Sequence, residues 1–209
     1  ESQGYAIYHQ DEKLGSFQLK VPGEHNALNA LAAFVVSYKT GISAAKCIDG
    51  LHKFQGVDRR FQRLGARNGI EIYDDYGHHP REIAATLQAA RESWPDRRLV
   101  MVYQPHRYTR TRDLFADFSQ VLSLPDKLLL LDVYSAGEAP IAGADGAALL
   151  AEIKKRVQTM PVFVDKHEEL PQHFAKELRP GDVVLMQGAG NIGSLAARLA
   201  ATQLKEAVK

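Results

Sequence analysis

The sequence contains a single cysteine, Cys47, and no apolar run near the roughly 20 residues that a membrane-spanning helix requires. One cysteine excludes an internal disulfide and suits a reducing compartment. Residues 1–4 carry neither the basic nor the apolar segment of a secretion signal, and no initiator methionine precedes them. We therefore expect a cytoplasmic protein with no membrane partner, represented by part of a longer polypeptide.

The sequence also lacks an excess of charge of either sign, because its 26 lysines and arginines are balanced by 25 aspartates and glutamates, which gives a formal net charge of +1. Such a balance gives no general attraction to nucleic acid or to anionic lipid. Apolar residues make up 45% of the chain and charged residues 24%, the proportions of a globular protein. We therefore expect small-molecule ligands and no nucleic acid partner for these 209 residues.

Residues 1–60 are predicted to be the end of one domain. Segments 5–8 and 16–19 alternate between apolar and polar residues, which predicts a β-hairpin with its turn over 11–15. A two-stranded hairpin is not stable alone. We expect it to pair with another part of the protein, or with a second copy of the chain in a dimer.

Two helices are predicted after the hairpin. The first begins at Asn26, its predicted cap, and ends at Gly41, and the second runs from a cap at Ser43 to His52. Helical spacing predicts one apolar face on the first helix. That face consists of Leu28, Leu31, Ala32, Val35 and Val36.

Strands and helices alternate through residues 61–209, after a predicted boundary at 56–60. The dipeptide at 68–69, Asn-Gly, predicts a tight hairpin. Near-continuous apolar strands between amphipathic helices predict an α/β fold with a doubly wound, mostly parallel, Rossmann-like sheet. The predicted strands are 61–67, 70–75, 98–103, 127–132, 161–164 and 182–186, and the predicted helices are 80–93, 110–122, 145–157, 170–178 and one that starts at Asn191.

Two carboxylates and two imidazoles follow the strand predicted over 70–75. Asp74, Asp75, His78 and His79 precede a helix predicted to begin at Pro80. Ligands of open α/β sheets bind at the carboxyl ends of strands, which favours a site here. A capping or turn role for one aspartate is the alternative. The histidine spacing lacks the patterns of zinc sites, so no metal site is expected.

The next predicted α/β junction carries a second polar stretch. Residues 104–110 contain His106, Arg107 and Arg110, and Arg112 follows. Guanidinium groups bind carboxylates and phosphates at two points, and positive side chains at a helix start oppose the helix dipole. An anionic substrate that bears a carboxylate is therefore expected, with a solvated helix start as the alternative.

Several catalytic motifs are absent or misplaced. Residues 188–193, Gly-Ala-Gly-Asn-Ile-Gly, match the dinucleotide pattern G-x-G-x-x-G, but they follow the last predicted strand and lack the acidic residue and the further strand of that binding mode. We interpret them as a tight strand-to-helix turn, with NAD binding as the alternative. The sequence contains neither the G-x-S-x-G elbow of hydrolases nor a G-K-[ST] phosphate loop.

Six segments together resemble the Mur ligase family, in particular its members that attach L-alanine to UDP-N-acetylmuramate. They occur in the family order between about Val21 and about Gly193. The family members that recycle a murein tripeptide resemble the chain less, at residues 76–77 and 104–110. The segments are GEHNALN at 23–29, RRF at 59–61, DDYGHHP at 74–80, QPHRYTR at 104–110, YSAGEAPI at 134–141 and QGAGN at 187–191.

The resemblance implies a three-domain protein with a UDP-sugar domain, a central ATPase domain and a C-terminal Rossmann-like domain. Residues 1–60 would end the central domain, and residues 61–209 would form the C-terminal domain. The implied reaction uses ATP and Mg²⁺ to activate a carboxylate as an acyl phosphate, which L-alanine attacks during peptidoglycan synthesis.

The resemblance also assigns roles to individual residues. Asn26 and Asn29 would lie near the adenine, Arg60 near the phosphates, and Asp75 near the nucleotide across the cleft. The residues expected at the amino acid and the reacting carboxylate are Tyr76, His78, His106, Arg107 and Arg110. The expected catalytic groups are Arg60, His106 and Arg107.

The absence of a phosphate loop from the sequence limits the activity expected of this polypeptide. We expect that, without the N-terminal domains of the parent protein, it neither hydrolyses ATP nor forms the amide. The alternative is a non-catalytic module that binds nucleotide and amino acid beside a partner chain.

Overall fold

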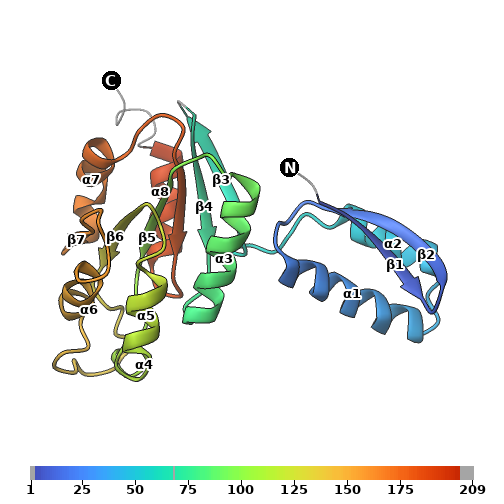
Figure 1. The fold of residues 1–209 in the computed structure, drawn as a ribbon, viewed down its shortest axis with the longest axis horizontal. Coiled ribbons are helices and arrows are strands. Elements are labelled where there is room, and N and C mark those ends of the chain that lie inside the picture. The colour runs from blue at the N-terminus through green and yellow to red at the C-terminus, as the bar shows by residue number, and fades with distance from the viewer. Residues whose placement is uncertain (1–2, 68, 203–209) are drawn as a thin grey trace.

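The structure is a computed structural model that describes residues 3–67 and 69–202. It contains a two-stranded sheet and a six-stranded sheet. Figure 1 shows the small sheet with its two helices joined to the larger body through an extended segment. No helix within the described residues is both long enough and apolar enough to cross a membrane.

The N-terminal unit packs two helices on a hairpin. Strands β1 (Gln3–His9) and β2 (Glu12–Leu19) pair antiparallel, and helices α1 (Glu24–Lys39) and α2 (Ala44–Lys53) follow. The hairpin is therefore stabilised within this chain, by a core that includes both helices. That core contains Ile7, Phe17, Leu19, Val21, Ala30, Phe34 and Cys47.

The hairpin turn is shorter than the predicted 11–15, because strand β2 already begins at Glu12 and only Asp11 of that range lies in the turn. The turn consists of Gln10 and Asp11, and the φ of 55° at Gln10 is left-handed. Gly15 belongs to the strand instead, and a Cβ there would lie 2.1 Å from Ile48 Cδ1 of α2. The absence of a side chain at Gly15 therefore permits the close approach of α2, which is a known role of glycine within a strand.

The predicted apolar face of α1 lies on a helix as expected, but it is exposed in this chain. Leu28, Leu31, Val35 and Val36 are 59%, 41%, 45% and 65% exposed, and Ala32 is exposed as well. The hairpin packs against a different face of the helix, which buries Ala30 and Phe34. Nothing within the described residues covers the predicted face.

The start of α1 differs from the prediction as well. Gly23, with φ 103°, is the N-cap, and Asn26 lies inside the first turn with its amide nitrogen donating to Pro22 O over 2.7 Å. Ser43 is the N-cap of α2 as predicted, although its side chain makes no capping hydrogen bond.

The larger body confirms the predicted α/β fold. Its sheet has the order β3-β4-β8-β5-β6-β7, and β3 is antiparallel to β4 while the other pairs are parallel. The β3–β4 hairpin is as predicted, although Asn68 of its turn lies outside the described residues. The strands are β3 (Gln62–Arg67), β4 (Ile70–Asp75), β5 (Leu99–Tyr103), β6 (Lys127–Leu131), β7 (Val162–Val164) and β8 (Val183–Gln187).

Helices cover both faces of this sheet (Figure 1), because successive strand residues point to opposite sides. Leu99 and Met101 join a core with residues of α3, α5 and α6. Val100 and Val102 join a second core with residues of α7 and α8. The helices are α3 (Pro80–Ser93), α4 (Tyr108–Asp113), α5 (Phe115–Val121), α6 (Gly146–Lys154), α7 (Leu170–Glu177), preceded by the 3₁₀ turn η1 (His167–Glu169), and α8 (Ile192–Thr202).

One predicted helix is two helices. The chain leaves helical geometry at Leu114, where φ is −115° and ψ is 24°, so the helix predicted over 110–122 becomes α4 and α5. The break allows each piece to bury its own face, with Tyr108 and Thr111 on α4 and Phe118 on α5.

The last strand, β8, lies between β4 and β5. Asp75 at the end of β4 and Tyr103 at the end of β5 both pair in register with Gln187 at the end of β8. The two polar junctions predicted from the sequence therefore share one sheet edge, with the Gly188–Gly193 turn between them.

Candidate functional site

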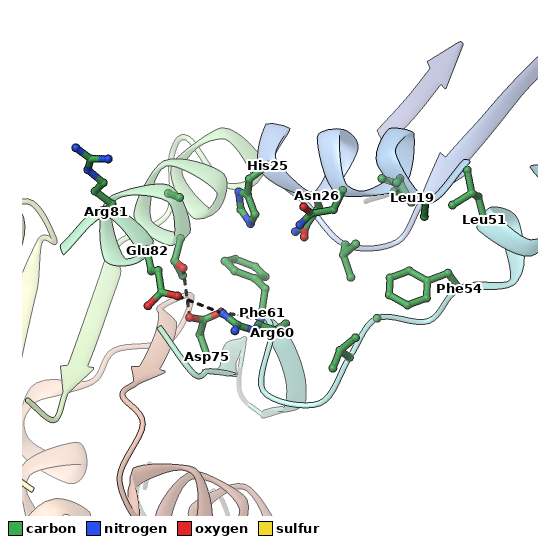
Figure 2. Close-up of a pocket in the computed structure, with 18 residues that line it drawn as sticks. Leu19, His25, Asn26, Leu51, Phe54, Arg60, Phe61, Asp75, Arg81 and Glu82 are labelled. Carbon is green, nitrogen blue, oxygen red and sulfur yellow. Dashed lines mark hydrogen bonds and ion pairs between the residues drawn. The ribbon is translucent and has the colours of Figure 1, made fainter. Parts of the chain in front are cut away.

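A cavity of about 650 Å³ separates α1 from the carboxyl edge of the large sheet. Figure 2 shows His25 and Asn26 of α1 on one side and Arg60, Asp75 and Glu82 on the other. Its lining is mainly apolar, with Leu19, Leu51 and Phe54 among the contributors. The four residues predicted to bind nucleotide, Asn26, Asn29, Arg60 and Asp75, all line it.

The Asp75 carboxylate is buried at this edge and accepts four hydrogen bonds. It is 6% exposed, and its Oδ2 accepts a hydrogen bond of 3.0 Å from the backbone N–H of Phe61. Its Oδ1 accepts from Gly77 N at 2.8 Å, Gln187 Nε2 at 2.7 Å and Thr86 Oγ1 at 3.4 Å. Asp75 therefore ties the segment between the two units to β8 and α3.

The adjacent arginines 59 and 60 have different surroundings. Arg59 donates to Asp74 Oδ2 over 3.0 Å and to Gly188 O over 2.6 Å, and its guanidinium lies 4.9 Å from the centre of the Tyr76 ring. Arg60 lines the cavity, and its Nη1 lies 3.7 Å from Glu82 Oε1, which is long for an ion pair. Arg59 thus holds the segment on the sheet while Arg60 remains available to a ligand.

His79, and neither aspartate, caps α3. Its Nδ1 accepts from Arg81 N at 3.2 Å, while Glu82 Oε2 accepts from the backbone N–H of His78 at 2.9 Å and of His79 at 3.1 Å. Burial alone would raise the pKa of Glu82, but these hydrogen bonds and the nearby charges of His78 and Arg60 outweigh it and lower that pKa. Glu82 consequently bridges the cavity and the histidines.

The residues predicted at the amino acid lie along the same edge. The Tyr76 and His78 rings are 5.5 Å apart edge to face, and the His78 and His106 rings are 6.1 Å apart. His106 also stacks on Tyr134, with centroids 5.5 Å apart and planes 15° from parallel. Tyr76, His78 and His106 therefore form one aromatic row.

Arg107 and Arg110 flank this row. Arg110 Nη1 donates to His106 O over 3.1 Å and lies 3.3 Å from His106 Nδ1, and no carboxylate pairs with it among the described residues. Arg107 Nη1 is 3.8 Å from Glu138 Oε1. Arg112 instead pairs with Asp113 on the exposed side of α4.

Burial lowers the pKa of His106, and the charges of Arg110, His78 and Arg107 lower it further. A neutral imidazole can accept the Arg110 hydrogen bond at Nδ1. This arrangement leaves the Arg110 guanidinium as a stable positive group, which suits an anionic ligand.

The sequence did not single out four residues that organise the edge. Gln104 Nε2 donates to Asn191 Oδ1 over 2.8 Å, and Gln104 Oε1 accepts from Ile192 N at 3.2 Å. Gln187 donates to Asp75, Glu82 completes the capping box that His79 begins on α3, and Glu138 accepts from Thr109 of α4. The turn at 188–193 needs its glycines for space, since a Cβ on Gly190 would lie 2.5 Å from Gln104 Oε1. Glu82, three residues after His79, was the one with a local signal, because that spacing fits a capping box.

Metal ligands are sparse at this edge. Among the residues described, no group of three or more histidine, cysteine, aspartate or glutamate side chains could hold a metal ion.

The chain matches the family described as Mur ligase, glutamate ligase domain, over residues 59–190. Among solved structures, the UDP-N-acetylmuramate–alanine ligase MurC of Thermotoga maritima has a TM-score of 0.80 at 29% identity, over 96% of this chain and 42% of that one. A murein peptide ligase of Psychrobacter arcticus 273-4 has a TM-score of 0.65 at 23% identity, over 97% of this chain and 42% of that one.

The MurF ligase of Thermotoga maritima, solved in complex with ADP, has a TM-score of 0.69 at 16% identity, over 98% of this chain and 44% of that one. At this identity, and at that of the murein peptide ligase, the likeness shows the fold alone. The chain spans less than half the length of each of these relatives.

Proposed function

The chain belongs to the Mur ligase family, and we propose that it is the C-terminal part of a cytoplasmic ligase that joins L-alanine to UDP-N-acetylmuramate in peptidoglycan synthesis. The observation that carries the proposal is the shared edge. Asn26, Asn29, Arg60 and Asp75 line one cavity, and Glu82 connects that cavity to His78. The higher identity to the alanine ligase than to the murein peptide ligase supports L-alanine as the amino acid.

The cavity fits the base and sugar of ATP better than its phosphates. Its walls are largely apolar, and Asn29 on α1 adds an amide that can hydrogen-bond a purine. Arg60 also lines the cavity, and its ion pair with Glu82 is long at 3.7 Å, so its guanidinium could approach a phosphate. We propose that residues 1–60 belong to the central ATP-binding domain, whose phosphate loop and Mg²⁺ ligands come from a preceding part of the protein.

ATP would supply a phosphoryl group that activates the carboxylate of the sugar substrate. The residues of this chain would orient the partners of that reaction. Arg110, which pairs with no carboxylate in the described part of the chain, and Arg107 would hold the carboxylate of the amino acid. The row of Tyr76, His78 and His106 would surround its amine and side chain. Closure of the two units would exclude water, which would otherwise hydrolyse an activated carboxylate.

The test is an assay of the whole gene product. Phosphate release is measured with ATP, Mg²⁺ and UDP-N-acetylmuramate, with L-alanine or with the tripeptide L-alanyl-γ-D-glutamyl-meso-diaminopimelate added. Release that depends on L-alanine supports the proposal, and release that depends only on the tripeptide assigns the recycling reaction instead.

A second assay tests residues 1–209 alone. We expect no ATP hydrolysis and no amide formation, because the phosphate loop is absent from this sequence. Turnover by these residues alone would contradict the proposal that the phosphate loop and the Mg²⁺ ligands come from a preceding part of the protein.

A further inference from the structure

Glu138 lies in the loop between β6 and α6, thirty-one residues after Arg107, yet it packs against the start of α4. Its Oε2 accepts a hydrogen bond of 3.0 Å from the backbone N–H of Thr109, and its Oε1 accepts one of 2.7 Å from Thr109 Oγ1. The same Oε1 is 3.8 Å from Arg107 Nη1. One carboxylate therefore contacts both the backbone of α4 and the side chain that precedes it.

Helix α4 needs such a partner because its own N-cap is Arg107, whose side chain cannot accept a hydrogen bond. Asp, Asn, Ser or Thr at that position would satisfy an N–H group of the first turn. Glu138 supplies the missing acceptor from another loop. The bond to Thr109 is consequently the cap of α4.

Arg107 is held in an unusual backbone conformation. Its φ is +74°, a left-handed value that costs energy for a residue with a Cβ. Hydrogen bonds fix it on both sides, since its N–H donates to Tyr134 O over 2.8 Å and its carbonyl accepts from Thr111 Oγ1 at 2.9 Å. This backbone conformation determines the direction in which the Arg107 side chain points, and its guanidinium lies next to Glu138.

Charge gives Glu138 a second effect on the site. Hydrogen bonds from Thr109, followed by the charge of Arg107, lower the pKa of Glu138 and keep it ionised. The groups that act on His106 are Arg110 of α4, His78 before α3, Arg107, and Glu138. The first three favour the neutral imidazole, whereas Glu138 favours the protonated form.

We propose that Glu138 is a positioning residue of the ligase site, which fixes the Arg107 guanidinium and the start of α4 and balances the positive charge around His106. The part that concerns catalysis rests on the proposed function, because it takes Arg107 and His106 as groups that face the substrates. The part that concerns His106 rests on this chain's own geometry, because Glu138 Oε1 lies 3.8 Å from Nη1 of Arg107, the residue that follows His106.

The experiment compares Glu138→Gln with two further variants. Glu138→Gln removes the charge but keeps an oxygen that can accept from Thr109, and Glu138→Asp keeps the charge with a shorter reach. Glu152→Gln is the control, because Glu152 on α6 also pairs with cations, Lys155 and Arg156, and lies outside the site.

The first measurement is an NMR titration of His106 in the 209-residue chain. Glu138→Gln should move the midpoint to lower pH, and Glu138→Asp and Glu152→Gln should leave it near the wild-type value. A midpoint in Glu138→Gln equal to that of the control would overturn the electrostatic role.

The second measurement is steady-state kinetics of the whole ligase. Glu138→Gln should raise KM for the amino acid roughly tenfold, as when a charge-assisted contact is misaligned, with a smaller change in KM for ATP. Glu138→Asp should recover part of that loss. Equal KM values in Glu138→Gln and Glu152→Gln would overturn the positioning role. A whole protein without ligase activity would overturn the proposed function, while the titration would still decide the effect on His106.

Discussion

Gln187 of β8 and Asp75 of β4 are register partners in adjacent strands, and Gln187 Nε2 donates a 2.7 Å hydrogen bond to Asp75 Oδ1. The same amide donates to Thr86 Oγ1 of α3 over 3.1 Å. Because Gln187 is fully buried, these bonds are made in a low-dielectric environment, where they are strong and where an unpaired group is costly. Gln187 therefore holds the carboxylate that connects the two units.

We expect Gln187→Met to lower the free energy of unfolding by about 0.5–1.5 kcal/mol, the net contribution of a lost hydrogen bond, because Asp75 Oδ1 keeps Gly77 N and Thr86 Oγ1 as donors. Methionine has a similar volume, so the loss reports the hydrogen bonds more than the packing. Guanidinium unfolding of the 209-residue chain measures the change. Gln172→Met, at an exposed position of α7, should stay within about 0.5 kcal/mol of the wild type, and an equal loss in both variants would refute the role.

The strands and helices of the large sheet could be predicted from the sequence because their signals are local. Helix α3 has the predicted bounds, since Pro80 starts it and apolar residues recur at helical spacing. Asp145 caps α6 as predicted, accepting from Ala148 N at 2.7 Å. Strand order could not be predicted, because nothing within β8 says that it inserts between β4 and β5.

The candidate site could be predicted only in part, for a similar reason. Asp75 and His106 belong to motifs with short spacing, so the sequence predicts them. Gln187 and Glu138 act through contacts with residues 112 and 29 positions away. Such long-range contacts depend on the tertiary fold, which a single sequence does not display.

The buried Asp74 carboxylate should make stability depend on pH. Burial raises its pKa, and the charge and hydrogen bond of Arg59 only partly oppose this. A raised pKa means that the fold favours the protonated acid, so ionisation of Asp74 removes stability as pH rises from its ordinary pKa of 3.8 through the raised value. The stability that Asp74 contributes is therefore largest below that interval.

Asp74→Asn cannot ionise, so its free energy of unfolding should improve relative to the wild type as pH rises through that interval. The attraction of Arg59 for the ionised carboxylate is already contained in the raised pKa of Asp74, where burial outweighs it. Guanidinium unfolding between about pH 4 and about pH 7 measures both proteins. For Glu152→Gln, the free energy of unfolding should instead fall relative to the wild type as pH rises, because the Lys155 hydrogen bond lowers the pKa of Glu152. Parallel curves of unfolding free energy against pH for wild type and Asp74→Asn would contradict the argument.

Arg110 should control both the charge of His106 and the binding of the amino acid. After burial, the Arg110 charge is the largest cause of the lowered pKa of His106. Arg110→Met should therefore raise that pKa, whereas Arg110→Lys keeps a positive charge and should leave it near its wild-type value. NMR titration of His106 measures the difference, and an unchanged midpoint in Arg110→Met would refute this coupling.

In the whole ligase, both Arg110 variants should bind the amino acid more weakly. Arg110→Met should raise KM by roughly tenfold to hundredfold, corresponding to the about 1.5–3 kcal/mol of a hydrogen bond to a charged group. Arg110→Lys should lie between, because lysine lacks the two-point fork. Equal KM values in wild type and Arg110→Met would show that Arg110 does not face the substrate.

Gly190 should tolerate no side chain. A Cβ there would lie 2.5 Å from Gln104 Oε1 and 2.7 Å from Tyr134 Cγ, so both side chains would have to move. Gly190→Ala should therefore cost about 1–3 kcal/mol of stability and disturb the Tyr134 ring on His106. Gly50→Ala, in open space on α2, should instead stabilise the chain by about 0.5–1 kcal/mol, and thermal unfolding compares the two.

The two faces of α1 should respond differently to substitution. Phe34 is 2% exposed and packs in the N-terminal core, so Phe34→Ala should cost about 3–5 kcal/mol. Val35 is 45% exposed, so Val35→Glu should change the stability of the 209-residue chain by less than about 0.5 kcal/mol.

The whole ligase should give a different result for Val35→Glu. The exposed apolar face of α1 then packs, on our proposal, against the preceding part of the central domain, where a glutamate would be buried without a partner. The loss of stability there should reach about 3 kcal/mol or more, because an unpaired buried charge is costly. If Val35→Glu were harmless in both proteins, this face would remain exposed in the whole ligase, and the assignment of residues 1–60 to a larger domain would lose its structural support.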